Sequence, residues 1–178
     1  MARLTSKKTE VTSFRLESNA LAEMRKIAEN EKVSLNTLVS QIFDQYINWS
    51  HSATKAGFVP FPKTMLIKIF DKLNDEQIID VANYVVDEQM KSLMLVVRKA
   101  YTVEDFVKGL GYWAKTSNFH FRYVEKSEKT HQYIMQHDMG KKWSLFYKRI
   151  FEQTLIQLGA KKPDIDTTDS TVVMTMFD

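Results

Sequence analysis

The segment that most constrains this chain is residues 9–49, in which one hydrophobic periodicity gives way to another. Residues 9–16 alternate polar and apolar side chains, which predicts a short β-strand. Apolar residues then recur at helical spacing, which predicts one helix over 18–31 and a second over 34–49. An unpaired strand leaves its backbone N–H and C=O groups open, so we expect it to pair with the same strand of a second copy. The expected product is an obligate homodimer that contains a two-stranded ribbon.

The two faces of the predicted strand have different chemistry. The residues expected to form the shared core of the dimer, on the strand and on the second helix, are Thr12, Phe14, Leu16, Leu38 and Ile42. The opposite face of the strand carries Val11, Ser13 and Arg15. A two-stranded ribbon fits the major groove of DNA, where Arg commonly pairs with guanine. The outward face therefore indicates a surface that reads DNA.

This order of strand, helix, turn and helix resembles the ribbon-helix-helix family of dimeric DNA-binding transcription regulators. The resemblance covers residues 9–49 and includes the interhelical segment, residues 25–37. In that family the strand touches base edges, and backbone N–H groups at the start of the second helix anchor a DNA phosphate. The resemblance therefore implies that the DNA contacts in the strand and the second helix are Val11, Ser13, Arg15, Ser34, Leu35 and Asn36. The Ser34 hydroxyl is also expected to cap the second helix.

Two positions depart from the family's pattern. The turn between the helices contains Glu31 and Lys32, where the family often has Gly or Asn in a left-handed conformation. A non-Gly residue there costs roughly 1 kcal/mol. The Pro that often opens the family's first helix is also missing. The alternative interpretation is a strand and helical hairpin within some other α+β domain.

Residues 1–8 form a basic arm, because Arg3, Lys7 and Lys8 precede the first acidic residue, Glu10. Lys7 and Lys8 are candidates for contacts with DNA phosphates, which would make binding depend on salt. The alternative is an ordinary basic N-terminus. Residues 50–61 are small and polar, and we expect a linker there, followed by a C-terminal domain over 62–178.

The C-terminal domain begins with a helical segment and then changes to period two. Strands are expected at 119–123 and 131–137, a long helix up to Gly159, and a further pair of strands that ends at 171–176. This order predicts a small antiparallel sheet with one long helix, so the fold class of the whole chain is α+β. A segment with the pattern His-x-x-Gly-x-x-Trp-Ser, starting at His137, is similar to C-terminal domains of uncharacterised archaeal regulators. That likeness is faint and implies no ligand.

The expected core of this domain consists of Trp113, Trp143, Phe146, Tyr147 and Phe151. Aromatic residues at this density could surround a small apolar pocket or fill a solid interior. The sequence slightly favours the solid interior, because no polar residue of the aromatic helix is placed to orient a ligand.

Catalysis, metal binding and a cofactor have no support in the sequence. No nucleophile motif, zinc motif or phosphate-binding loop is present, and the absence of Cys excludes thiolate metal sites. His131 and His137 would lie about 20 Å apart along one strand, too far to share an ion within a chain. A site that includes His120, or one built between subunits, is the alternative left open. We expect neither a membrane span nor a signal peptide, and therefore a cytoplasmic protein.

These observations favour a homodimeric, sequence-specific DNA-binding transcription regulator, for instance a repressor. Its partners would be double-stranded DNA and a second copy, with an unidentified small-molecule effector as a further option. The alternative is an antitoxin-like or scaffold protein whose C-terminal domain binds a protein partner. Antitoxins usually end in a short disordered tail, whereas the apolar periodicity of this tail predicts a folded one, which favours the regulator.

Overall fold

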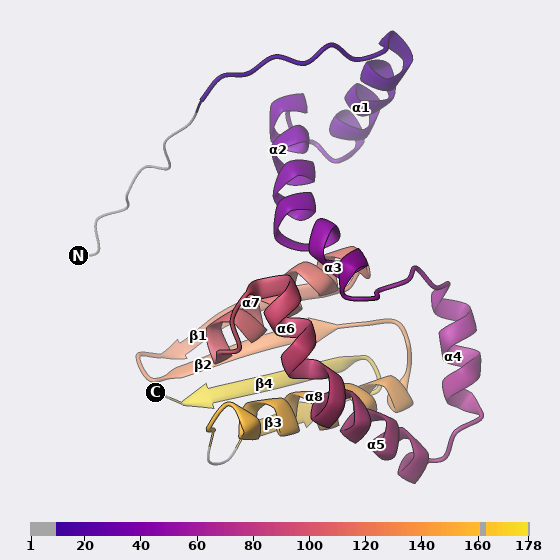
Figure 1. Cartoon of the computed structure of the whole chain (residues 1–178), viewed down its shortest axis with the longest axis vertical. Helices are drawn as coiled ribbons and strands as arrows, with labels where there is room; N and C mark the ends of the chain where they lie inside the picture. Colours follow the sequence, from indigo (N-terminus) through magenta and orange to yellow (C-terminus); the bar gives the residue numbers. More distant parts are fainter. Residues whose placement is uncertain (1–9, 161–162, 178) are drawn as a thin grey trace. The chain divides into compact units, whose positions relative to one another are not determined.

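The computed structural model describes residues 10–160 and 163–177 (Figure 1). The chain divides into two compact units, one that ends at Asp44 and one that begins at Gln45. The N-terminal unit contains helix α1 (Ser18–Asn30) and most of helix α2 (Leu35–Gln45).

One hydrogen bond at the end of α1 and one at the start of α2 hold the turn between these helices. Lys32 has φ 56°, so a non-Gly residue does occupy the left-handed position. The Val33 N–H donates to the Ala28 carbonyl over 2.9 Å and closes the end of α1. The Thr37 N–H donates to Ser34 Oγ over 3.0 Å, which confirms Ser34 as the cap of α2. The sequence alone therefore predicted the local chemistry of this turn.

The ribbon-helix-helix start of the expected fold class is wrong. Residues 10–17 form neither a strand nor a helix, and regular structure begins at α1. All strands of the described residues lie between His120 and Phe177. A period-two pattern gives a strand only where a second strand supplies hydrogen bonds, and no described strand pairs with residues 10–17. Three residues expected in a shared core, Thr12, Phe14 and Leu16, are consequently exposed.

The helical part of the C-terminal unit starts earlier than expected. Residues 50–61 were expected to be a linker, but they include helix α3 (His51–Lys55), in which Ala53 is buried. Two short π-helical turns interrupt the α-helices of this unit. In chain order its helices are η1 (Tyr46–Ser50), α3, α4 (Lys63–Asp71), α5 (Asp75–Tyr84), η2 (Val85–Met90), α6 (Lys91–Arg98), α7 (Val103–Thr116) and α8 (Lys141–Gln157).

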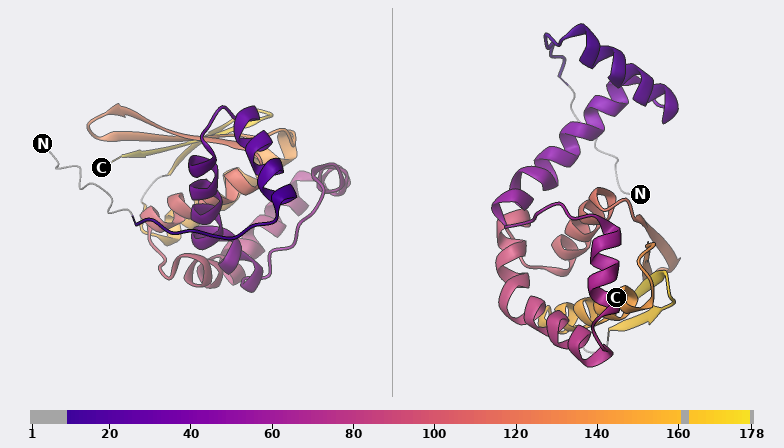
Figure 2. Two further views of the ribbon diagram at one scale, coloured as in Figure 1. Left: turned by 90° about the horizontal axis from the view of Figure 1, so that it is seen from above. Right: turned by 90° about the vertical axis from the view of Figure 1, so that its right-hand side faces the viewer.

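The four strands form one antiparallel sheet in the order β1-β2-β4-β3. Their bounds are β1 (His120–Ser127), β2 (Thr130–Gln136), β3 (Asp164–Thr167) and β4 (Thr171–Phe177). With α8 between β2 and β3, the order strand, strand, helix, strand, strand is the one expected from the sequence. Figure 2 shows the strands as one layer, with helices of the same unit on one side of it.

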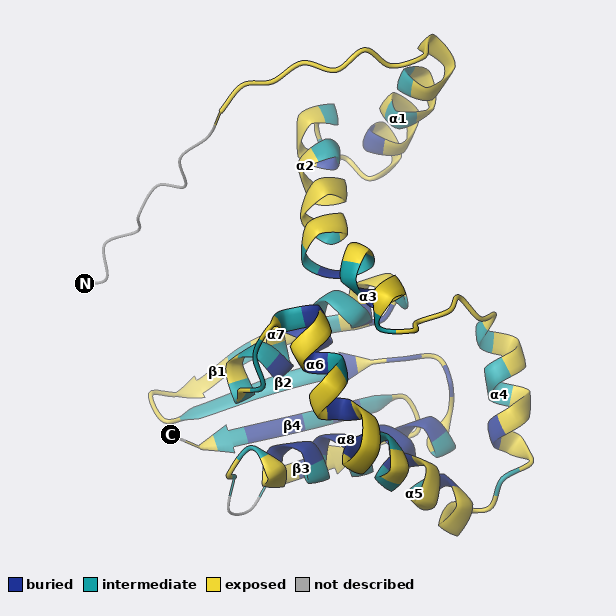
Figure 3. Cartoon of the chain, viewed as in Figure 1, coloured by how far each residue is buried: buried dark blue, intermediate teal, exposed yellow. Residues whose placement is uncertain are grey.

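One main hydrophobic core holds the C-terminal unit together. Helix α8 packs on α5 and on strands β3 and β4, while α7 packs on β1. The buried positions therefore follow α8 and the central strands (Figure 3). Of the five expected core aromatics, Trp143, Phe146, Tyr147 and Phe151 are buried in this core, and Trp113 is partly buried against it.

Candidate functional site

The residues expected to contact DNA lie on the surface of the N-terminal unit. Val11, Ser13 and Arg15 are exposed on the segment 10–17, outside any helix or strand. At the start of α2, Ser34 and Asn36 are exposed and Leu35 is half-buried. The remaining two candidates, Lys7 and Lys8, lie outside the described residues.

Among the described residues, the N-terminal unit exposes more large apolar side chains than it buries. Among its described residues only Ala28 and Leu38 are buried. The large apolar side chains that it exposes, called the apolar face below, are Val11, Phe14, Leu16, Ile27, Ile42 and Phe43. Phe14 meets the edge of Phe43 at a ring-centroid distance of 5.7 Å, yet its side chain is still 62% exposed. Of the five residues expected in a dimer core, Leu38 is therefore buried within the unit, while Ile42 and the three on the segment 10–17 are free to meet a partner.

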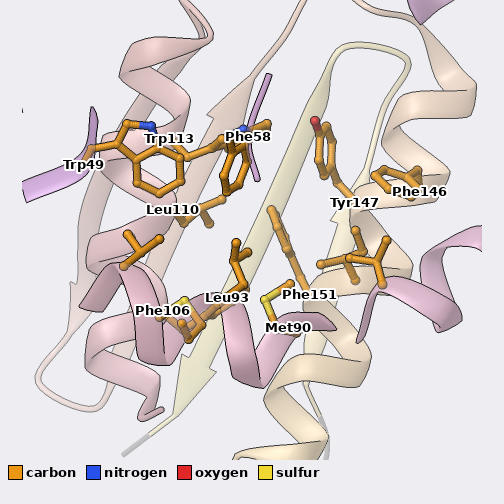
Figure 4. A pocket seen from close by; sticks show the side chains of 15 residues that line it. Trp49, Phe58, Met90, Leu93, Phe106, Leu110, Trp113, Phe146, Tyr147 and Phe151 are labelled. Atoms are coloured by element: carbon orange, nitrogen blue, oxygen red, sulfur yellow. The ribbon is translucent and has the colours of Figure 1, made fainter. Parts of the chain in front are cut away.

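The C-terminal unit contains an apolar cavity of about 200 Å³. The space is partly open to the surface, so the preference for a solid interior stays a prediction. Side chains from α6, α7, α8 and both π-helical turns face this space, as Figure 4 shows. The lining residues are Trp49, Phe58, Val85, Met90, Leu93, Met94, Val97, Phe106, Gly109, Leu110, Trp113, Phe146, Tyr147, Ile150 and Phe151.

A second, more polar pocket of about 610 Å³ adjoins this cavity. Trp49, Phe58, Trp113 and Tyr147 line both spaces, so these four side chains form the boundary between them. The second pocket adds polar groups to its wall, among them Lys63.

A buried histidine lies where β2 leads into α8. His137 Nε2 is 3.0 Å from Ser144 Oγ, and the Met139 N–H donates to His137 Nδ1 over 3.3 Å. Because Nδ1 accepts a hydrogen bond, the neutral imidazole carries its proton on Nε2 and donates it to Ser144. Burial lowers the pKa of His137, with a smaller contribution from Lys63 in the same direction, while Asp138 opposes both.

This histidine makes the stability of the fold depend on pH. The folded state binds fewer protons than the unfolded state below the ordinary His pKa of 6.5. The stabilisation is complete above that pH and is lost as the pH falls, by at most about 1.4 kcal/mol per pH unit. We expect His137→Gln to reduce the difference in unfolding free energy between neutral and mildly acidic urea titrations. His120→Gln, at an exposed position of β1, is the control. An unchanged difference in His137→Gln would contradict the assignment.

Two of the histidines make hydrogen bonds within the chain. His131 is 2.6 Å from the Tyr123 hydroxyl, and His137 is bound to Ser144. Within residues 10–160 and 163–177, no three His, Asp or Glu side chains lie close enough to share an ion. In the same residues, no helix is both long and apolar enough to cross a membrane.

Comparisons with known proteins leave the chain without an assigned family. No protein-family model matches it, and no curated protein matches it. Among solved structures, the chain is similar to a mutant H-NOX protein from K. algicida in its Fe(II) unliganded form, at 11% identity and a TM-score of 0.25. That match covers 99% of this chain and 82% of the other. At this TM-score the match carries no argument about fold or ligand.

Proposed function

We propose that this chain is a homodimeric DNA-binding transcription regulator. The observation that carries the proposal is the apolar face on a unit that buries only Ala28 and Leu38 among its described residues. A unit of this size cannot stabilise itself with so small a core, and a second copy is the partner that would cover the same surface on both chains. Exposed large apolar side chains, two of which (Phe14 and Phe43) touch each other, favour such an interface.

DNA is the partner best suited to the polar side of the same unit. On the segment 10–17, Arg15 is the one long hydrogen-bond donor, and it is exposed. Arg can bind guanine with two hydrogen bonds in the major groove. The start of α2, with Ser34 and Asn36 exposed, offers the backbone N–H groups and positive helix end that favour phosphate.

The C-terminal unit supports a regulator over an antitoxin. An antitoxin tail folds when it meets its toxin, whereas strands β3 and β4 already pair with the rest of the sheet here. A folded unit with an apolar cavity is better suited to sensing than to coupled folding. As a DNA-binding regulator the protein would act in the cytoplasm.

Replacing Arg15 tests the DNA contact. We expect Arg15→Ala to weaken binding to the best duplex of the parent chain by roughly 1–3 kcal/mol, because the hydrogen bonds to the base are lost. Arg25→Ala, on the exposed surface of α1, should bind that duplex as the parent does. Fluorescence anisotropy with a labelled duplex measures both variants at one salt concentration. Equal affinity of Arg15→Ala and the parent would remove Arg15 from the reading surface.

A further inference from the structure

The two π-helical turns of the C-terminal unit meet at the apolar cavity. Trp49 comes from η1, and Val85 and Met90 come from η2, and all three line the space. The two turns are far apart in sequence, and they are the π-helical turns found in the described residues. Such turns are rare, interrupt the regular hydrogen bonds of an α-helix and occur frequently at functional sites. Their convergence on one cavity distinguishes it from an incidental packing defect.

The size of the cavity limits what it could hold. An apolar cavity of about 150 Å³ is large enough to bind benzene. The cavity here, at about 200 Å³, has room for a benzene ring with a short substituent. Its wall carries no ionisable side chain other than the Tyr147 phenol. A charged ligand would lose its hydration without a compensating charge, so the occupant must be uncharged.

Tyr147 supplies a polar contact at one end of the space. Burial raises the pKa of its hydroxyl well above the ordinary value, so the group remains a protonated donor. Tyr147 lines both this cavity and the adjoining pocket. As a protonated donor, the hydroxyl can give a hydrogen bond to a ligand oxygen. In Figure 4 the hydroxyl lies at the edge of the ring of side chains around the cavity.

The adjoining pocket provides a route into the cavity. Phe58 borders both spaces, is partly exposed and meets the edge of Trp49 at a ring-centroid distance of 5.2 Å. It lies in the segment between α3 and α4, outside any helix or strand. Phe58 therefore lies where the two spaces adjoin.

We propose that the C-terminal unit binds a small uncharged ligand, with an aromatic or alicyclic body in the cavity and one oxygen that accepts from the Tyr147 hydroxyl. This binding does not depend on the proposed DNA-binding function. It would hold even if the N-terminal unit served another purpose.

Calorimetric titration of the full chain with acetophenone and isopropylbenzene tests this proposal. The two probes have nearly the same shape, but only acetophenone carries an acceptor oxygen. We expect saturable binding of both, with acetophenone bound roughly threefold to tenfold more tightly because of one hydrogen bond. A rise in melting temperature of about 2–4 °C should accompany near-saturation.

Three variants assign the binding to the cavity. Leu93→Phe fills space in its wall and should weaken both probes at least tenfold, whereas Leu95→Phe makes the same change on the exposed side of α6 and should weaken neither. Tyr147→Phe should bring acetophenone to the affinity of isopropylbenzene and leave isopropylbenzene unchanged. Circular dichroism confirms that each variant is folded. Absence of saturable binding to the parent chain, or equal binding by folded Leu93→Phe, would overturn the proposal.

Discussion

Phe14→Asp is expected to convert the homodimer to a monomer. Phe14 belongs to the apolar face and is 62% exposed in a single chain, so a second copy must bury it if the face is the dimer interface. An aspartate there would place an unpaired charge in that interface, at a cost of roughly 3–5 kcal/mol. One chain has a mass of 20.8 kDa. Light scattering should therefore give a molar mass of twice that value for the parent protein and of that value for the variant.

Ser13→Asp is the matched control for this change. Ser13 is the neighbouring residue, is exposed and does not belong to the apolar face, so the same charge there should leave the molar mass unchanged. Two results would count against the interface: a parent chain that is already monomeric at micromolar concentration, or a Phe14→Asp variant that stays dimeric.

Trp143→Ala is expected to lower the unfolding free energy by about 3–5 kcal/mol. The Trp143 ring stacks on Phe70 at a centroid distance of 4.0 Å and meets Phe146 and Tyr147 at 5.5 and 5.4 Å. Truncation would remove all three contacts and leave a void where α4 and α8 pack. Urea unfolding followed by circular dichroism measures the loss.

Trp143→Phe separates the role of the ring from that of the indole nitrogen. Trp143 Nε1 is buried without a hydrogen-bond partner among the described residues, so its removal breaks no bond. Trp143→Phe should therefore cost much less than Trp143→Ala. Equal losses in the two variants would show that the nitrogen, rather than the stacked ring, stabilises this part of the core.

The sequence predicted the elements whose determinants are local. Asn74 and Gln77 have the spacing of a capping box, and the structure shows both of its bonds. Asn74 Oδ1 accepts from the Gln77 N–H at 2.8 Å, and Gln77 Oε1 accepts from the Asn74 N–H at 2.9 Å. Positive φ at Gly159 similarly follows the end of α8. The segment 10–17 was mispredicted as a strand because a strand requires a partner, which the pattern of one chain does not supply.

The cavity could not be predicted for a related reason. Its existence depends on how the volumes of side chains from α6, α7, α8 and both π-helical turns fit together, and periodicity reports only which side of a helix is apolar. The π-helical turns also depend on packing, since the residues of η1 continue the apolar pattern of α2 without a break. The sequence signal that could have drawn attention to this region was Gly109, which lines the cavity from the middle of α7.

Selection of duplexes from a random DNA pool by the full-length chain tests the proposed function most directly. A homodimer that reads bases should enrich one sequence with two-fold symmetry, because each copy would contact an equivalent half-site. The Phe14→Asp variant should enrich no such sequence under the same conditions. If the parent chain retains no duplex at about 0.1 M salt, or enriches the pool no further than this variant does, the chain is not a dimeric DNA-binding regulator.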